Sequence, residues 1–357
     1  MATERKSGGV LGGVMMPHAP QFLTLPETED KATVERVRSI AAENGRRLAA
    51  LAPDVWIVCA NDHANQFFLH CTPSFAFHVG GEVRGHFAGR SFRYPVASEI
   101  SLALLAHLQQ EGFDPAFTST AEIDYAFGIP MIFLGIAAPV IPLYVNAYVP
   151  PQPPMERCYA LGQALARGLA ALGKTAVIVA SGGMSHFPGT DRYASPDLEF
   201  DRALLSRLET GNLRSLLALD ERTLDRHGNV ELRSWAIAAG MLGERKPDMT
   251  SLDPSWHHVY GTLAFYSPRV ERRDPLHYPA VHPHRVKLTA ALHRLANQAD
   301  ERARYLADPR AYAAEAGLSA EEAGPLAAMD QAAIVALGVH PLVPFLAKLQ
   351  IDRERGR

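Results

Sequence analysis

Apolar runs that end abruptly on polar residues recur along the first part of this chain. Gly9–Met16 leads into PHAP, Val55–Ala60 leads into NDHANQF, and residues 175–180 lead into SGGMSH. Continuous apolar runs of this length are typical of strands that are covered on both faces. Residues 32–51 and 156–172 lie between these runs and carry apolar side chains at helical spacing. The alternation predicts βαβ units and therefore an α/β domain.

Weaker elements complete the pattern up to residue 267. We expect strands at 75–79, 140–148 and 256–266, and helices at 98–110 and 229–242. A cluster of prolines at 150–154 stops the second of these strands, because proline lacks the N–H group that a strand ladder needs. The helix at 229–242 would hold Glu231 in its first turn, with Asn229 as the N-cap.

The composition changes after Tyr266. Residues 268–284 are rich in Pro, Arg and His and are predicted to be a linker. Residues 285–357 have a helical pattern, with a capping box from Ser319 to Glu322 and another N-cap at Asp330. The sequence therefore predicts a large domain over residues 1–267 and a small all-α domain over residues 285–357.

Composition and charge narrow the classes of function. Hydrophobic residues make up 47% of the 357 residues, which is enough to bury a full core. The formal charge of −3 gives no electrostatic reason to expect nucleic acid or an anionic membrane as a partner. The three cysteines lack CxxC spacing, which favours a reducing compartment. No apolar run has the length of a signal-peptide core or a membrane span, so we expect a cytoplasmic protein.

Candidate catalytic side chains gather at the predicted strand ends. His18, His63 and His186 each follow an apolar run by a few residues, and ligands of open α/β sheets bind just beyond the carboxyl ends of the strands. Together with Glu231, the first two histidines would form a site of two histidines and one carboxylate. Such a site leaves one face of the metal open and suits non-haem Fe(II).

Simpler roles compete with this interpretation. The chain has 15 histidines, most of which must be structural or surface residues. A glutamate in the first turn of a helix, such as Glu231, often serves only to favour the helix dipole. A zinc hydrolase would also use His and Glu, but the HExxH motif is absent, and the cysteines lack ligand spacing. The residue types alone therefore leave several interpretations open.

The motifs together resemble the class III, LigB-type extradiol ring-cleaving dioxygenases, typified by protocatechuate 4,5-dioxygenase. The matching segments follow the family's order over residues 9–267 and are PHAP, NDHANQF, IDYAFGIP, VNAYVPPQPPMERCYALG, SGGMSH, NVELRSW and HHVYGTLAF. The tail resembles the small LigA-type α subunit of the same enzymes, fused behind the catalytic domain as in gallate dioxygenases. The resemblance implies an α/β fold with a three-layer α/β/α catalytic domain and a small all-α C-terminal domain.

The resemblance also implies a role for each candidate residue. His18, His63 and Glu231 would bind Fe(II), and His186 would be the catalytic acid–base residue. The reactants would be O2 and a small aromatic diol similar to protocatechuate or gallate. Asp62 would support the neighbouring His63, although capping of the following turn explains this residue equally well.

The chain departs from the protocatechuate-type pattern at Tyr125, where many members have His. A tyrosine hydroxyl still donates a hydrogen bond, so Tyr125 stays a catalytic and substrate-binding candidate. The family's contacts to the substrate carboxylate map near His257 and His258, which also differ here. These departures leave a 2-aminophenol as an alternative substrate, and a metal-free binding protein resembling the Memo proteins as a second alternative. We also expect a homo-oligomer, in the form of a dimer.

Overall fold

The computed structural model describes residues 8–268 and 278–356 of the chain. Two compact units divide the chain, Met1–Val270 and Glu271–Arg357. The linker expected at 268–284 falls in large part on residues 269–277, which lie outside the described residues. The domain limits therefore stay a prediction. Within the described ranges, no helix is both long enough and apolar enough to cross a membrane.

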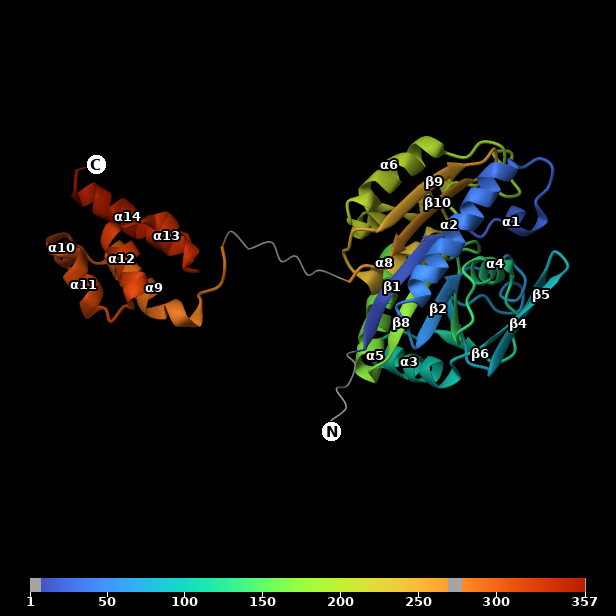
Figure 1. Cartoon of the computed structure of the whole chain (residues 1–357), viewed down its shortest axis with the longest axis horizontal. Helices are drawn as coiled ribbons and strands as arrows, with labels where there is room; N and C mark the ends of the chain where they lie inside the picture. The colour runs from blue at the N-terminus through green and yellow to red at the C-terminus, as the bar shows by residue number, and fades with distance from the viewer. Residues whose placement is uncertain (1–7, 269–277, 357) are drawn as a thin grey trace. The chain divides into compact units, whose positions relative to one another are not determined.

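An eight-stranded mixed sheet forms the centre of the first unit (Figure 1). Its strands are β1 (Gly9–Met16), β2 (Val55–Ala60), β3 (Phe75–His78), β6 (Ala116–Thr118), β7 (Val140–Val145), β8 (Thr175–Ser181), β9 (Met249–Pro254) and β10 (Val259–Phe265). They lie in the order β6-β3-β7-β2-β8-β1-β10-β9. The middle strands β7, β2, β8 and β1 are parallel, so their carboxyl ends open at the same edge of the sheet.

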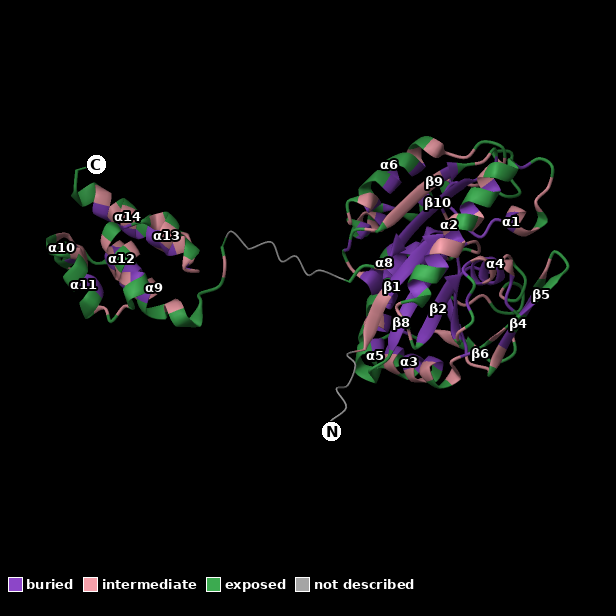
Figure 2. Cartoon of the chain, viewed as in Figure 1, coloured by how far each residue is buried: buried purple, intermediate pink, exposed green. Residues whose placement is uncertain are grey.

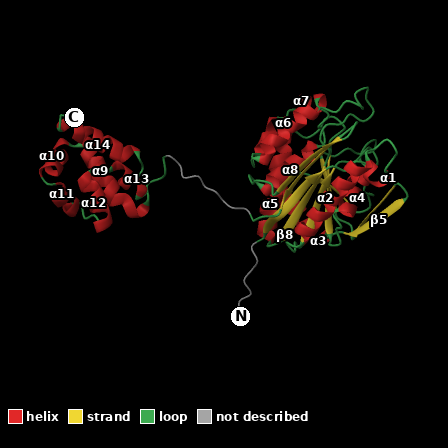
Figure 3. Ribbon diagram, turned by 45° about the horizontal axis from the view of Figure 1, so that its top comes forward, coloured by secondary structure: helices red, strands yellow, loops and turns green. Residues whose placement is uncertain are grey.

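Helices cover both faces of this sheet, as Figures 1 and 3 show. Ile57 of β2 packs into the hydrophobic cluster on one face, and its neighbour Val58 packs into the cluster on the other. The first face is covered by α3 (Ser98–Gln110), α5 (Met155–Leu172) and α8 (Leu232–Leu242), and the second by α2 (Lys31–Ala49) and α4 (Tyr125–Phe133). Buried residues follow the strands between these layers (Figure 2). The predicted α/β/α architecture is confirmed.

Helices α5 and α8 pack with their backbones in close contact. A Cβ atom on Gly162 would lie 2.0 Å from the carbonyl oxygen of Ile237, and one on Gly240 would lie 2.0 Å from that of Tyr159. Only glycine fits at both positions without a shift of the backbone. This contact holds α8 against α5, and it thereby fixes the position of Glu231, which directly precedes the first residue of α8.

Several elements differ from the sequence expectations. Four strands were not predicted: β4 (Glu82–Phe87) and β5 (Arg90–Pro95), which form a hairpin, and β6 and β9. These strands are short or half-exposed and carry many polar residues. The strand predicted at 256–266 begins only at Val259, the first residue of β10, and a turn precedes it. Asn229 does not cap α8, because its side chain donates to Asp201 Oδ1 at 3.0 Å. Glu231 is the N-cap residue instead.

The first unit also contains the helices α1 (Gln21–Thr24), α6 (Leu198–Glu209) and α7 (Glu221–Arg226) and the 3-10 helix η1 (Leu213–Ala218).

The second unit is helical throughout its described part. It contains η2 (Pro283–Arg285), α9 (Val286–Asn297), α10 (Ala299–Ala307), α11 (Pro309–Glu315), α12 (Ala320–Ala328), α13 (Gln331–Ala336) and α14 (Leu342–Glu354). Its own hydrophobic core includes Leu292, Tyr305 and Ile351. The expected capping box of Ser319 and Glu322 opens α12, and Asp330 caps α13 by accepting from Ala333 N. The local helix signals in this part of the sequence are therefore confirmed.

Candidate active site

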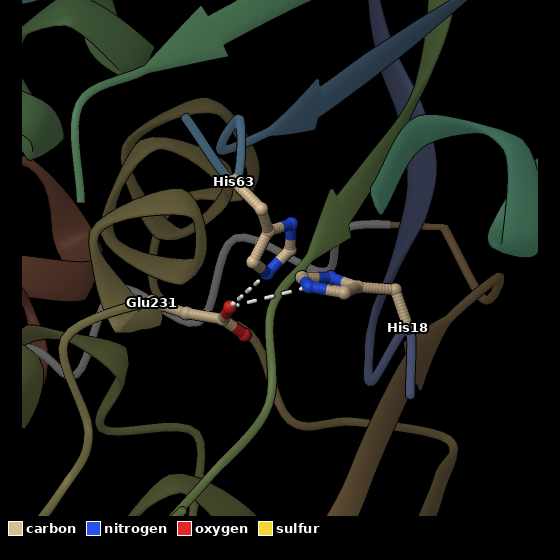
Figure 4. Close-up of side chains that lie close together, drawn as sticks. All are labelled: His18, His63 and Glu231. Atoms are coloured by element: carbon tan, nitrogen blue, oxygen red, sulfur yellow. Dashed lines mark ion pairs between the residues drawn. The ribbon is translucent and has the colours of Figure 1, made fainter. Parts of the chain in front are cut away.

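The parallel strands bring distant histidines to one edge of the sheet. His18 follows the end of β1, His63 follows β2, and His186 follows β8, which lies between those two strands. Glu231 reaches the same place from the start of α8 (Figure 4). The oxygen and nitrogen atoms that His18, His63 and Glu231 offer as ligands all lie within 4.8 Å of one another. These three side chains form a potential metal site.

The Glu231 carboxylate is the centre of this group. Its Oε1 atom lies 3.2 Å from His18 Nε2 and 3.5 Å from His63 Nε2 (Figure 4), and its Oε2 atom accepts the backbone N–H of Gly183 at 2.6 Å. Burial opposes ionisation of Glu231, but the charges of His18 and His186 and their hydrogen bonds hold the pKa of its carboxyl well below the usual range. The side chain is therefore available as an anionic ligand.

The ring of His18 is held in one tautomer. Ser181 Oγ donates its single proton to the carbonyl oxygen of Ala126 at 2.5 Å. The 2.9 Å contact between Ser181 Oγ and His18 Nδ1 therefore requires Nδ1–H as the donor. Nε2 is then the ring atom that faces Glu231, 3.2 Å from Oε1. A ring fixed through Nδ1–H, with Nε2 turned towards the other possible ligands, has the arrangement of a metal-binding histidine.

His63 is oriented in the same way, but by Asp124 rather than by Asp62. Its Nδ1–H lies 3.0 Å from Asp124 Oδ2, which also accepts the backbone N–H of His63 at 3.2 Å. Burial disfavours the charged form of His63, but hydrogen bonds to Asp124 and Glu231 raise its pKa to about 10. The site thus attracts a cation.

The expectation that Asp62 supports His63 is corrected by these contacts. Asp62 Oδ2 accepts the backbone N–H groups of Asn65, Gln66 and Phe67 at 2.8, 3.0 and 3.1 Å. This carboxylate therefore caps the turn that follows β2, which was the competing explanation. Asp124 is free to reach His63 because it precedes α4 at the same edge of the sheet and caps that helix through Ala126 N.

His186 lies beside the triad with both ring nitrogens engaged. Its Nδ1–H donates to the carbonyl oxygen of Met184 at 2.8 Å, and its Nε2 lies 3.1 Å from Tyr148 Oη and 3.6 Å from Glu231 Oε1. The ring stacks on His258 with 4.2 Å between centroids and 4° between planes. Burial lowers the pKa of His186, but the negative charge of Glu231 outweighs that effect and raises it.

A small cavity is lined by six of the predicted site residues. Its volume is about 100 Å³, on the scale of a single aromatic ring. Among its lining residues are His18, His63, Tyr125, His186, His257 and His258. Tyr125 stacks on His63 with 4.4 Å between ring centroids and 13° between planes, and burial raises the pKa of its hydroxyl well above the usual value. The hydroxyl therefore stays protonated and keeps its capacity to donate.

The other wall of the cavity comes from the turn between β9 and β10. Glu29 accepts hydrogen bonds from His257 Nε2 at 2.8 Å, Trp256 Nε1 at 3.1 Å and Ser255 Oγ at 3.0 Å, and so fixes this turn. His258 is buried, and its Nε2 has no hydrogen-bond partner among the described residues. Burial and the neighbouring charge of His186 lower the pKa of His258 well below its usual value, so its ring is neutral.

The residues that orient the site were not among those predicted from the sequence. Asp124, Ser181 and Tyr148 each make a direct hydrogen bond to one of the predicted histidines. Ser181 and Tyr148 also lie at or just beyond strand ends, β8 and β7 respectively, so the rule that selected the histidines could have selected them too. Glu29 gave no such signal, because it lies in a polar loop before α2.

Asp201 joins the segment of His186 to the segment of Glu231, and we expect it to make stability depend on pH. The buried carboxyl accepts from Ser185 N at 2.8 Å and Asn229 Nδ2 at 3.0 Å, and burial raises its pKa from 3.8 to about 7. A pKa that is higher in the folded state means that this group's contribution is complete below pH 4 and is lost as the pH rises through 7, by on the order of a few kcal/mol.

The measurement is the free energy of unfolding of the metal-free protein in urea at several pH values. Asp201→Asn mimics the neutral acid and serves as the control. The stability of the wild type relative to this variant should fall between pH 4 and pH 7, and a difference that stays constant with pH would contradict the expectation.

Comparison with known proteins identifies the family. Residues 12–265 match the family of the catalytic LigB subunit of aromatic ring-opening dioxygenase. The chain belongs to this family. Residues 288–351 match the LigA subunit of the aromatic-ring-opening dioxygenase LigAB. Both resemblances stated from the sequence motifs are confirmed, and so is the enzyme class, an extradiol ring-cleavage dioxygenase. The alternative of a non-catalytic binding protein is not supported.

Curated relatives agree with this LigB assignment. A 2,3-dihydroxyphenylpropionate/2,3-dihydroxicinnamic acid 1,2-dioxygenase of Klebsiella pneumoniae strain 342 is 32% identical over 240 residues, which are 66% of this chain and 72% of the relative. An enzyme of the same name from Paraburkholderia phymatum is 27% identical over 302 residues, which are 70% of this chain and 94% of the relative.

Among solved structures, an uncharacterized protein from Escherichia coli K12 matches with a TM-score of 0.48 and 14% identity, over 71% of this chain and 99% of that one.

Proposed function

We propose that this LigB-type enzyme is a non-haem Fe(II)-dependent extradiol dioxygenase that opens a catecholic ring and incorporates both atoms of O2. The observation that carries the proposal is the convergence of two ring nitrogens, Nε2 of His18 and Nε2 of His63, on the Glu231 carboxylate. A set of two imidazole nitrogens and one carboxylate oxygen is the donor set that Fe(II) takes in oxygenases. The residues present therefore fit the metal.

When bound, Fe(II) would bring the aromatic diol and O2 together and supply the redox chemistry that couples them. The protein's own groups then orient the reactants and move protons. His18, His63 and Glu231 would hold the metal, because Ser181, Asp124 and Gly183 respectively fix the two rings and the carboxylate.

His186 is the proposed acid–base residue. Its Nδ1–H stays with the Met184 carbonyl oxygen, so proton exchange takes place at Nε2, which faces the triad. The lined cavity beside it would receive the aromatic ring and exclude bulk water. Formation of the catechol dianion requires a base at this position, and departure of the product requires an acid, and an imidazole serves in both roles near neutral pH.

The substrate contacts we propose are Tyr125, His257 and His258, which line the same cavity. A diol similar to protocatechuate or gallate is the first candidate substrate. A 2-aminophenol is the second, because the neutral Tyr125 hydroxyl both donates and accepts and therefore suits a phenol oxygen or an amine nitrogen. The dimer expected from the sequence also stays a proposal, which light scattering on the purified full chain would test.

The proposal is tested by loading the metal-free full chain with Fe(II) under anaerobic conditions. Catechol, protocatechuate, gallate, 2,3-dihydroxyphenylpropionate and 2-aminophenol are then added with 18O2. We expect a yellow ring-opened product that contains both labelled oxygen atoms for at least one catechol. Loading with Zn(II), which does not change its oxidation state, is the control. A product that carries one labelled atom, or no turnover with any diol or aminophenol, would refute the proposal.

A further inference from the structure

Tyr148 is held between two groups of the active site by its own loop. This loop follows β7, and Asn146 closes it: Asn146 Oδ1 accepts the N–H of Val149 at 3.0 Å, and Asn146 Nδ2 donates to Val149 O at 2.5 Å. The Tyr148 ring lies 5.6 Å from the His63 ring, centroid to centroid. The hydroxyl is thus delivered by a closed loop rather than by a mobile side chain on the surface.

The Tyr148 hydroxyl bridges the metal-site carboxylate and the proposed acid–base residue. Its Oη atom lies 2.9 Å from Glu231 Oε1 and 3.1 Å from His186 Nε2. Both distances are within the range of good hydrogen bonds. A tyrosine hydroxyl carries one proton, so it donates to one of these two partners at a time.

The hydrogen-bond roles follow from the other nitrogen of His186. A carbonyl oxygen only accepts, so the 2.8 Å contact with Met184 O places a proton on Nδ1. In the structure the Tyr148 O–H donates to Glu231 Oε1, so the 3.1 Å contact with His186 requires a proton on Nε2 as well, which donates to Oη. When Nε2 loses this proton it becomes an acceptor, and the Tyr148 O–H turns to it. In either state the hydroxyl ties His186 Nε2 to the edge of the triad.

We propose that Tyr148 is a positioning residue for ring opening, which acts through His186 by holding Nε2 beside the metal site and outside the set of metal ligands. The inference rests on the acid–base role proposed for His186. Without the hydroxyl, His186 Nε2 loses its nearest partner, while Glu231 keeps His18, His63 and the Gly183 N–H. The loss should therefore affect proton movement and leave metal binding intact.

The first test is Tyr148→Phe, which removes one oxygen atom and keeps the ring. We expect kcat to fall about ten- to hundredfold, the scale of one lost hydrogen bond to a charged group. We expect KM and the affinity for Fe(II) to stay within about threefold of the wild type, because the ligands and the cavity wall are unchanged. Tyr144→Phe is the matched control: Tyr144 is a buried tyrosine of β7, the strand before the Tyr148 loop, and packs its ring on Phe67.

A double-mutant cycle separates positioning from an independent effect. In the His186→Gln background, Tyr148→Phe should reduce kcat by less than about threefold, because the group through which it acts is already gone. A full reduction in that background would overturn the inference. So would a loss of bound Fe(II) from Tyr148→Phe, because Tyr148 would then serve the metal rather than His186.

A measurement on the metal-free enzyme tests the role of Tyr148 independently of whether the proposed function is correct. Long-range 1H–15N spectra of the 15N-histidine-labelled wild type should show the proton of His186 on Nδ1, and the Nε2 resonance should shift in Tyr148→Phe but not in Tyr144→Phe. A proton on Nε2 alone in the wild type would overturn the inference even if the variant were inactive or unfolded, and an unshifted resonance in the folded variant would overturn it as well. Absence of ring opening by the wild type would refute the proposed function instead.

Discussion

We expect His63→Ala to abolish metal retention and turnover and to leave the protein folded. His63 Nε2 is one of the three ligand atoms of the proposed iron site. Loss of a partner that only orients a ligand already costs ten- to hundredfold in affinity, so loss of the ligand itself should cost on the order of a hundredfold or more. Its side chain is 22% exposed and lies in the loop after β2, so the substitution leaves the hydrophobic core intact.

The measurement is the iron content of the purified variant after anaerobic loading and desalting, together with its turnover of the best substrate. His70→Ala is the matched control, because this exposed histidine lies on the same loop. Circular dichroism checks that both variants are folded. Iron at the wild-type level in His63→Ala would contradict the ligand set that we propose.

Replacing His186 by Gln should slow turnover but, unlike His63→Ala, should leave the iron content unchanged. Iron content should stay near stoichiometric, and ring opening should slow by roughly a hundredfold or more, the usual scale for a lost acid–base group. The reason is geometric: Nδ1 is bound to Met184 O, and Nε2 is bound to Tyr148, so the ring is engaged by the protein rather than by the metal site. A fourth protein ligand would also occupy a position that the diol or O2 needs.

Iron analysis and the pH profile of turnover distinguish the outcomes for His186. The profile should lose one limb, because the group that titrates in that limb is gone. Loss of iron from His186→Gln would make His186 a ligand and the proposed triad wrong. Normal turnover with an unchanged profile would mean that another group moves the proton, and Tyr125, which stacks on His63, becomes the next candidate.

The sequence was sufficient for the features that depend on local pattern. Apolar runs predicted the buried strands β1, β2 and β8, and the polar residues directly after them included His18, His63 and His186. These predictions succeeded because the carboxyl ends of parallel strands share one edge of a sheet, so position along the chain already indicates position in space. Capping signals predicted helices of the second unit for the same reason, since a cap lies next to the helix it begins.

Short and half-exposed strands could not be predicted from the pattern of apolar and polar residues. β4, β5 and β9 carry polar residues on their exposed sides, and their apolar positions are too few to distinguish a strand from a loop. The strand predicted at 256–266 includes residues 256–258, which lie before β10 in the structure. These residues lie in a turn instead, because Glu29 accepts hydrogen bonds from Ser255, Trp256 and His257.

Only the tertiary structure decided which groups orient the metal-site residues. Sequence proximity favoured Asp62 as the partner of His63, but the Asp62 carboxylate accepts hydrogen bonds from the backbone N–H groups of its own turn instead. The partner is Asp124, which α4 brings to the same strand edge, and the partner of Glu231 and His186 is Tyr148. A hydrogen bond depends on distances of about 3 Å between side chains, and such distances between remote segments are set by how the helices pack on the sheet rather than by any local pattern of residues.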